Sequence, residues 1–129
     1  MDFLFRRLRC SLTRFAYTRR VPELWNDLLN CLDLRACPSD EARDDVTLFD
    51  GANLQLEYHR LFGGQLLGQF VRAAQLSCPE KSIKSLHAVF AREGRADEPV
   101  RYDVTRQHEG RSFATLTAVA RQSRGVLAT

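Results

Sequence analysis

The sequence predicts an α+β fold in which an antiparallel sheet wraps around one long central helix, roughly Gln65–Ser77. Three observations support this prediction. Apolar side chains are spread widely around that helix, as they are in buried helices. Short strand-like segments precede it, and longer segments with alternating polar and apolar residues follow it. An apolar helix between such segments is typical of a domain with one sheet and one core.

A second helix is predicted near the N-terminus. Pro22 suits the first turn of a helix, because its missing N–H costs nothing there. Apolar residues then recur at helical spacing over Leu24–Leu32, and the pattern ends near Leu34. Pro38 and the polar run after it predict a loop. We interpret the Leu24–Leu32 stripe as a face that packs in the core or at an interface.

Four segments are predicted to be strands that pair with a neighbour in sequence. Val46–Asp50 and Asn53–Tyr58 are joined at a Gly-Ala pair and precede the central helix. After that helix, Val100–Gln107 alternates apolar and polar residues, Glu109-Gly110 supplies a tight turn, and Arg111–Ala120 returns antiparallel. The element order therefore favours a hotdog fold, in which the sheet surrounds one helix, over the other α+β sheets that the same order allows.

A fifth strand, Ser82–Ala91, is predicted to be apolar on both of its faces. A strand of this kind needs cover on both sides. The central helix covers one side, and no other segment of the sequence is available for the second. We therefore expect a partner subunit or a second domain to cover it.

The charge of the chain is divided unevenly along its length. The formal net charge is +3, but residues 1–20 carry six arginines against Asp2, a local charge of +5. The remaining residues therefore sum to −2.

We divide the chain into an Arg-rich N-terminal extension, residues 1–21, and a folded domain, residues 22–129. The folded domain gives no electrostatic reason to expect a nucleic-acid partner, and no apolar run is long enough to predict an integral membrane segment.

The N-terminus and the cysteines bear on localisation. The extension combines arginines with apolar residues near helical spacing, which is also typical of organellar transit peptides and membrane-surface helices. We favour a loosely ordered extension and a cytoplasmic protein, with an organellar location as the alternative.

The four cysteines form no CxxC pair and lie near no histidine at metal-ligand spacing, so we expect reduced thiols and no metal.

Three motifs resemble those of one enzyme family. The central helix begins with FGGQLLGQ followed by Ala73-Ala74, which resembles the FGGQ-x-x-GQ-x-x-x-AA signature of acyl-CoA thioesterase II (TesB-like) enzymes. Ser85-Leu86-His87 resembles the family's HSxH strand motif. Val100–Val104 and Gly110–Phe113 resemble its PIxYEV and DGRSF hairpin strands. The resemblance covers roughly Leu24 to Thr129.

The resemblance implies an enzyme that hydrolyses fatty acyl-CoA to free fatty acid and CoA. It also implies a double hotdog, in which the second unit supplies the catalytic Asp, Thr and Gln. We expect this sequence to be the N-terminal hotdog alone, with the second absent because the sequence is a fragment or the gene is truncated. The second hotdog would then be a missing domain or the other subunit of a homodimer.

The residues themselves agree that a catalytic base is missing from the central helix. Thioester hydrolysis by an activated water needs a general base and donors for the oxyanion. Between Gly63 and Ser77 the sequence has no Asp or Glu, only glutamines, whose amides can orient a water but cannot accept its proton. We therefore expect the chain alone to be inactive.

The candidate site residues are few. Gly63 and Gly64 let a backbone N–H approach the thioester oxygen, or simply allow a sharp turn from strand to helix. Gln65 is a substrate-binding candidate, although helix capping or burial against a neighbouring domain is the commoner role for such a glutamine. His87 is the candidate base and a substrate contact, against the alternative of a hydrogen-bonded structural histidine.

Two departures from the family pattern bear on the site. Lys84 stands where the first histidine of HSxH is usual, and Glu93 stands where the family has proline. The sequence contains no phosphate loop, nucleophile elbow or metal cluster, so no cofactor is expected. The alternative function is a non-catalytic hotdog that binds acyl groups or assembles with a partner, and a third option is a non-functional gene remnant.

Overall fold

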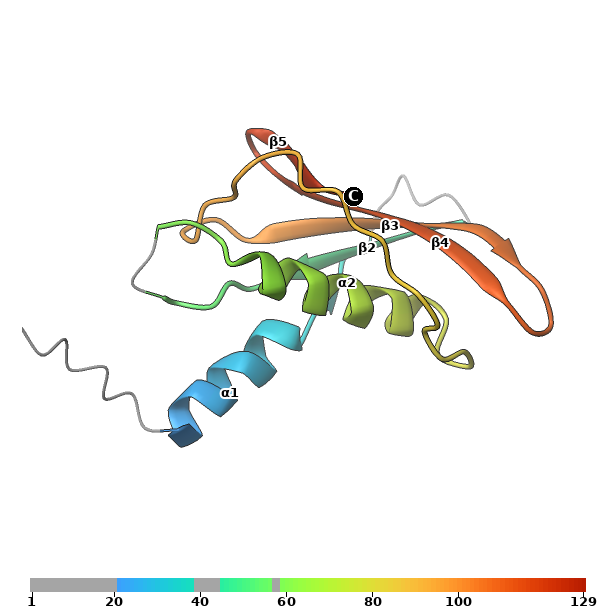
Figure 1. Ribbon diagram of the computed structural model, residues 1–129, viewed down its shortest axis with the longest axis horizontal. Coiled ribbons are helices and arrows are strands. Elements are labelled where there is room, and N and C mark those ends of the chain that lie inside the picture. The colour runs from blue at the N-terminus through green and yellow to red at the C-terminus, as the bar shows by residue number, and fades with distance from the viewer. Residues whose placement is uncertain (1–20, 39–44, 57–58) are drawn as a thin grey trace, which may run out of the picture.

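Five strands form one antiparallel sheet, and the long helix α2 lies against it (Figure 1). The structure is a computed structural model that describes residues 21–38, 45–56 and 59–129. Residues 1–20 of the predicted extension lie outside this range. The elements are α1 Val21–Leu32, β1 Arg35–Ala36, β2 Val46–Gly51, α2 Gly63–Ser77, β3 Val100–Glu109, β4 Ala114–Gln122 and β5 Gly125–Ala128. The strand order is β1-β2-β3-β4-β5, and each neighbouring pair is antiparallel.

The predicted central helix is confirmed, and it begins two residues earlier than expected, at Gly63. Phe62 has extended backbone angles and marks the start of the helix. Pro79 follows the last turn and disfavours helical geometry in the residue before it, so the helix ends before Cys78. Its contacts with β2, β3 and β4 bury the side of the helix that faces the sheet.

The core lies between α2 and the concave face of the sheet. Val100, Tyr102 and Val104 on β3 are fully buried, which confirms the alternation predicted for this strand. The ring of Phe70 meets that of Tyr102 edge-on, with ring centroids 5.4 Å apart and an interplanar angle of 81°. Edge-on aromatic pairs add stability beyond the area that they bury. The fold class, an α+β sheet wrapped around one helix, is therefore confirmed.

The strand predicted over Asn53–Tyr58 is wrong for its described part. Residues 53–56 form no strand, and residues 57–58 lie outside the described range. The reason is local, because the backbone N–H of Leu54 donates to the side-chain oxygen of Gln65 at 3.0 Å rather than to another strand. The chain therefore leaves the sheet after β2 and runs along the start of α2.

The strand predicted over Ser82–Ala91 is wrong for most of its length. Only its last residues pair with the sheet, through hydrogen bonds that join Val89 to Thr129 and Ala91 to Leu127. This antiparallel register places residues 82–88 beyond the end of β5, so they have no neighbouring strand among the described residues. The segment is exposed where burial on both faces was predicted.

Helix α1 packs against α2 at its C-terminal end and leaves much of its apolar stripe exposed. The helix ends at Leu32 rather than near Leu34. Leu32 contacts the helix at Gly68, where a Cβ would lie 3.2 Å from the leucine Cδ2 atom. Trp25 and Leu29 face outward, so the core interpretation of this stripe is wrong for them and the interface interpretation stays a prediction. Within the described part of the chain, no helix is long and apolar enough to span a membrane.

Candidate functional site

The two motif glutamines of α2 lie in a buried network of hydrogen bonds, together with Asn53 and Tyr102. We call these four residues the glutamine network. Gln65 and Gln69 lie one helical turn apart, and both are buried. The Nε2 atom of Gln65 donates to Oδ1 of Asn53 at 2.7 Å and to Oε1 of Gln69 at 3.2 Å.

Gln69 connects α2 to three other parts of the molecule. Its Nε2 atom donates to the carbonyls of Cys31 and Ala52, each at 2.8 Å. Its Oε1 atom accepts a hydrogen bond from the hydroxyl of Tyr102 at 2.5 Å. Burial raises the pKa of Tyr102, so the phenol stays protonated and remains a donor. Gln69 therefore ties the helix to the end of α1, to the turn after β2 and to β3.

The hydrogen bonds of this network limit the roles that are open to Gln65 and Gln69. The amide of Gln65 already donates twice and accepts from Leu54, and Gln69 uses both of its side-chain atoms as well. Neither side chain caps the helix, and their burial comes from this chain rather than from a neighbouring domain. The close packing extends to Gly51, where a Cβ would lie 2.7 Å from Nε2 of Gln69.

Asn53 and Tyr102 are the members of the network that sequence reasoning missed. The side-chain nitrogen of Asn53 also donates to the carbonyls of Ala96, at 3.2 Å, and Glu98, which fastens the 95–98 loop beside the helix. Asparagine is depleted in strands, so its presence at the start of a predicted strand was the available signal. Tyr102 carried no such signal, because a tyrosine on the apolar face of a strand is ordinary.

The start of α2 is the exposed end of the site. Gly63 and Gly64 occupy its first turn, which has no side-chain cap and no acidic residue. The ring of Phe62 folds back over Gly64, where a Cβ would lie 2.4 Å from a ring atom. The ring of Phe90 lies over Gly63, at 3.5 Å from the equivalent Cβ position. The backbone donors of this turn therefore lie beside two exposed aromatic rings.

His87 lies on the exposed segment between α2 and the β3 strand, and it is itself exposed. It makes no hydrogen bond or ion pair with another described residue, so the structure does not support the alternative of a hydrogen-bonded structural histidine. Since Phe90, three residues later, lies over Gly63, the segment that carries His87 leads toward the start of α2. The structure does not bring His87 into the glutamine network.

The convex face of the sheet carries two ion pairs between neighbouring strands. Arg101 pairs with Asp50 across β3 and β2, with Nε and Oδ1 3.1 Å apart, and Arg121 pairs with Asp103 across β4 and β3 at 2.8 Å. Partial burial would raise the pKa of Asp50, but hydrogen bonds from Arg101 and Cys37 outweigh it and lower the pKa below its ordinary value. This face is suited to solvent.

The remaining titratable groups of the described ranges form no metal site. Cys31, Cys37 and Cys78 are free thiols, and no three His, Cys, Asp or Glu side chains of these ranges converge as ligands. Burial raises the pKa of the Cys31 thiol, which makes it a poor nucleophile.

An antiparallel sheet wrapped around one central helix is the arrangement of a hotdog domain. Solved structures share this arrangement. The PaaI protein of Escherichia coli, 15% identical, matches with a TM-score of 0.59 over 81% of this chain and 86% of that chain. The family model described as acyl-CoA thioesterase N-terminal domain matches residues 56–129. The chain belongs to this family.

Relatives with established names agree with the family. The chain is 34% identical over 108 residues to acyl-CoA thioesterase 2 of Haemophilus influenzae, which covers 83% of this chain and 35% of the relative. It is 40% identical over 79 residues to human acyl-coenzyme A thioesterase 8, covering 60% of this chain and 25% of that protein. The tesB protein of Mycobacterium avium subsp. paratuberculosis matches with a TM-score of 0.69 and 27% identity, over 80% of this chain and 39% of that chain. The chain thus spans between a quarter and two-fifths of these proteins.

The network generates a prediction about stability. Replacement Gln69→Leu removes a side chain that satisfies the buried carbonyl of Cys31, the part-buried carbonyl of Ala52 and the buried hydroxyl of Tyr102. Each fully buried polar group left without a partner costs about 1–3 kcal/mol, so the free energy of unfolding should fall by at least about 2 kcal/mol. Urea denaturation measures this loss. Gln75→Leu is the matched control, because Gln75 is on the same helix and exposed, and its effect should stay within about 0.5 kcal/mol. Equal effects of the two replacements would contradict the assigned role of Gln69.

Proposed function

We propose that residues 22–129 form the N-terminal hotdog of an acyl-CoA thioesterase, and that with a second hotdog it hydrolyses fatty acyl-CoA to free fatty acid and CoA. The family membership supports the reaction class. The observation that carries the proposal is the uncapped first turn of α2 between two exposed aromatic rings. The burial of Cys31 and Cys78 as free thiols supports our proposal of a reducing, cytoplasmic location.

The first turn of α2 has the chemistry of an oxyanion site. The first N–H groups of a helix have no partner within the helix, and the helix dipole favours negative charge there. A thioester oxygen that approaches Gly63 and Gly64 meets these donors without a Cβ in the way. The rings of Phe62 and Phe90 supply apolar contact for the carbon atoms beside the thioester. In this proposal Gly63 and Gly64 bind the substrate directly.

Gln65 and His87 take different places in this proposal. Gln65 supports the site indirectly and does not contact the substrate. Its side chain is fully hydrogen-bonded and holds the 53–54 segment against α2. His87 is free to face substrate or a partner, since it is exposed and has no bond to other described residues. We retain it as a substrate contact and assign no catalytic residue within this chain.

A base from outside α2 is required. Helix α2 carries no carboxylate, and both of its buried glutamines are committed to internal hydrogen bonds. An amide cannot accept the proton of the attacking water. We therefore propose that the second hotdog supplies the carboxylate, while this chain supplies the oxyanion donors and part of the acyl-binding surface.

The surface for the second hotdog is the exposed segment after α2. We call Ile83, Leu86, Val89 and Phe90 the 83–90 strip. All four are exposed, Val89 at 68% and Phe90 at 50%. Exposed apolar surface marks interaction sites in soluble proteins, and this segment has four exposed apolar side chains within eight residues. The convex face, with its ion pairs, offers no comparable surface. The second unit is either another domain or another copy of this chain.

The proposal predicts binding without turnover in the isolated chain. Residues 1–129 should bind palmitoyl-CoA. The rate of CoA release should not exceed the rate in buffer without protein, because the general base is absent. Release of CoA is followed with a thiol reagent, and binding by calorimetry. Turnover at an ordinary enzyme rate would contradict the missing base. Binding by a stable dimer without turnover would favour the alternative function, a non-catalytic module that binds acyl groups.

A second prediction tests the glycine pair. In Gly64→Ala the new methyl group displaces the ring of Phe62, because the Cβ position lies 2.4 Å from that ring. Loss of the aromatic contact should weaken acyl-CoA binding about tenfold, which corresponds to roughly 1.4 kcal/mol. The melting temperature should change little, since the ring is exposed and can swing aside. Gly110→Ala, in the β3–β4 turn, is the control and should leave the affinity unchanged. An unaltered affinity in Gly64→Ala would remove the first turn of α2 from the site.

A third prediction tests the 83–90 strip. Val89→Arg places a charge in the proposed interface and should convert an associating chain to a monomer, as measured by sedimentation velocity. The same replacement should leave the unfolding free energy within about 0.5 kcal/mol, because Val89 contributes little to the core of the single chain. Thr117→Arg, on an exposed position of β4, is the matched control. If both variants associate like the unmodified chain, the strip is not the interface.

A further inference from the structure

Helix α1 presents an exposed apolar surface that the proposed function does not use. We call Trp25, Leu28 and Leu29 the α1 patch. All three side chains are exposed, Trp25 at 59% and Leu29 at 48%. The helix packs against α2 at its C-terminal end, and Figure 1 shows its N-terminal end directed away from the sheet. Within the described part of the chain, nothing covers the patch.

The acidic residues of α1 lie on the other side of the helix from the patch. Successive residues turn by about 100° around a helix axis, so the three patch residues share an arc of about 100°. Glu23 and Asp27, the charged residues of α1, fall about 150° or more from the centre of that arc. The patch can therefore enter apolar surroundings without burying either carboxylate.

The sequence directly before α1 is strongly basic. Residues 1–20 carry six arginines against Asp2, and Arg19 and Arg20 immediately precede Val21, the first residue of the helix. The structure of this extension lies outside the described residues, but its charge of +5 is attached to the start of α1. Residues 21–129 sum to −2. An anionic surface would therefore attract the N-terminal side of the chain and repel the rest, which turns α1 toward that surface.

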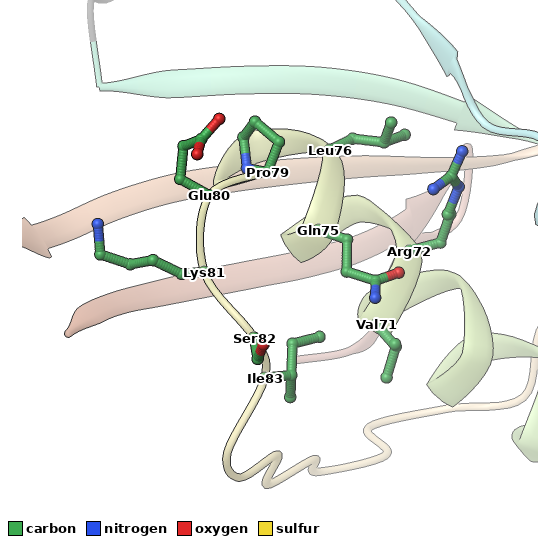
Figure 2. Close-up of a pocket in the computed structure, with 9 residues that line it drawn as sticks. All are labelled: Val71, Arg72, Gln75, Leu76, Pro79, Glu80, Lys81, Ser82 and Ile83. Carbon is green, nitrogen blue, oxygen red and sulfur yellow. The ribbon is translucent and has the colours of Figure 1, made fainter. Parts of the chain in front are cut away.

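The end of α2 has apolar surface as well, but it is bordered by charges of both signs. A hollow of about 620 Å³ lies there, between the last turns of the helix and the segment that follows. Figure 2 shows Glu80 next to Pro79, with Lys81 and Arg72 also around the hollow. Contact with an anionic surface would place the carboxylate of Glu80 against like charge. The α1 patch has no such neighbour on its own helix.

We propose that the α1 patch and the basic extension together bind the surface of a membrane that contains anionic phospholipids. The patch side chains enter the headgroup region, and the arginines lie close to the lipid phosphates. Tryptophan suits this depth, because its ring is apolar and its N–H can stay hydrated. Two weak signals of this kind, one apolar and one basic, hold a protein at a membrane where either alone is marginal.

This inference is independent of the proposed function, because neither the patch nor the extension belongs to the glutamine network or to the first turn of α2. It agrees with the proposed cytoplasmic location, since the cytoplasmic leaflet carries anionic lipids. Each basic residue near such a surface contributes about fivefold in affinity, which corresponds to about 1 kcal/mol.

The test uses the fluorescence of the full chain, residues 1–129. Trp25 is the single tryptophan of the sequence, so the emission reports directly on the patch. The chain is mixed with vesicles of phosphatidylcholine alone, or of phosphatidylcholine and phosphatidylglycerol in equal parts. With the mixed vesicles, the emission should shift to shorter wavelength and be quenched by lipids brominated in their acyl chains. Raised salt should weaken this binding, because it screens the arginines.

Matched variants separate the patch from the charge of the chain. Leu29→Glu places a carboxylate within the patch and should weaken binding to the mixed vesicles at least tenfold. Asn30→Glu adds the same charge at an exposed position on the other side of the helix, and it should weaken binding less than threefold. Arg19→Gln combined with Arg20→Gln should weaken binding about 25-fold. All variants should keep the melting temperature of the unmodified chain, since Leu29 and Asn30 are exposed.

Three outcomes would overturn the inference. Absence of binding to the mixed vesicles would remove the membrane as the partner. Equal losses in Leu29→Glu and Asn30→Glu would show that the patch does not enter the lipid. Emission at short wavelength without lipid, shifted to long wavelength by dilution or by Leu29→Glu, would identify the patch as an interface with another protein chain.

Discussion

The hydrogen bonds of Gln69 are the constraint on which the rest of the structure depends. One buried amide joins α2 to the C-terminal end of α1, to the turn after β2 and to Tyr102 on β3. Buried polar groups left without partners are costly, and a rotation or translation of the helix relative to the sheet would break these bonds. Because the helix is fixed in this way, its first turn places Gly63 and Gly64 beside the rings of Phe90 and Phe62, and its last turns lie beside the segment that follows Pro79.

The fold could be predicted wherever periodicity reports burial directly. The alternation of Val100, Tyr102 and Val104, and the apolar residues around α2, place those elements correctly. Periodicity does not say whether an extended segment has a neighbour to pair with. The backbone N–H of Leu54 donates to a side chain, and residues 82–88 run beyond β5. Neither segment therefore forms the backbone hydrogen bonds of a paired strand. Pairing depends on distant residues, which local patterns do not contain.

The candidate site could be predicted in part. The motif identified Gly63, Gly64 and Gln65, and the structure places the glycines at an open helix start and the glutamine behind them. The role of Asn53 could not be predicted, because it depends on carbonyls of the 95–98 loop more than forty residues away. The path of the chain after Pro79 could not be predicted either, since the segment was expected to pair as a strand and does so only at its last residues.

The network also explains why α2 has no catalytic carboxylate. The buried face of the helix is the face nearest the core, and its polar positions are Gln65 and Gln69. A carboxylate at position 69 could not donate to the carbonyls of Cys31 and Ala52, and three acceptors would then face one another in a medium of low dielectric constant. Gln69 therefore has to be an amide to hold the helix against the sheet, and Gln65 is already hydrogen-bonded to Asn53 and Leu54. In the proposed function the base therefore comes from another surface, and Phe90, the member of the exposed 83–90 strip that lies over Gly63, marks where such a surface can approach.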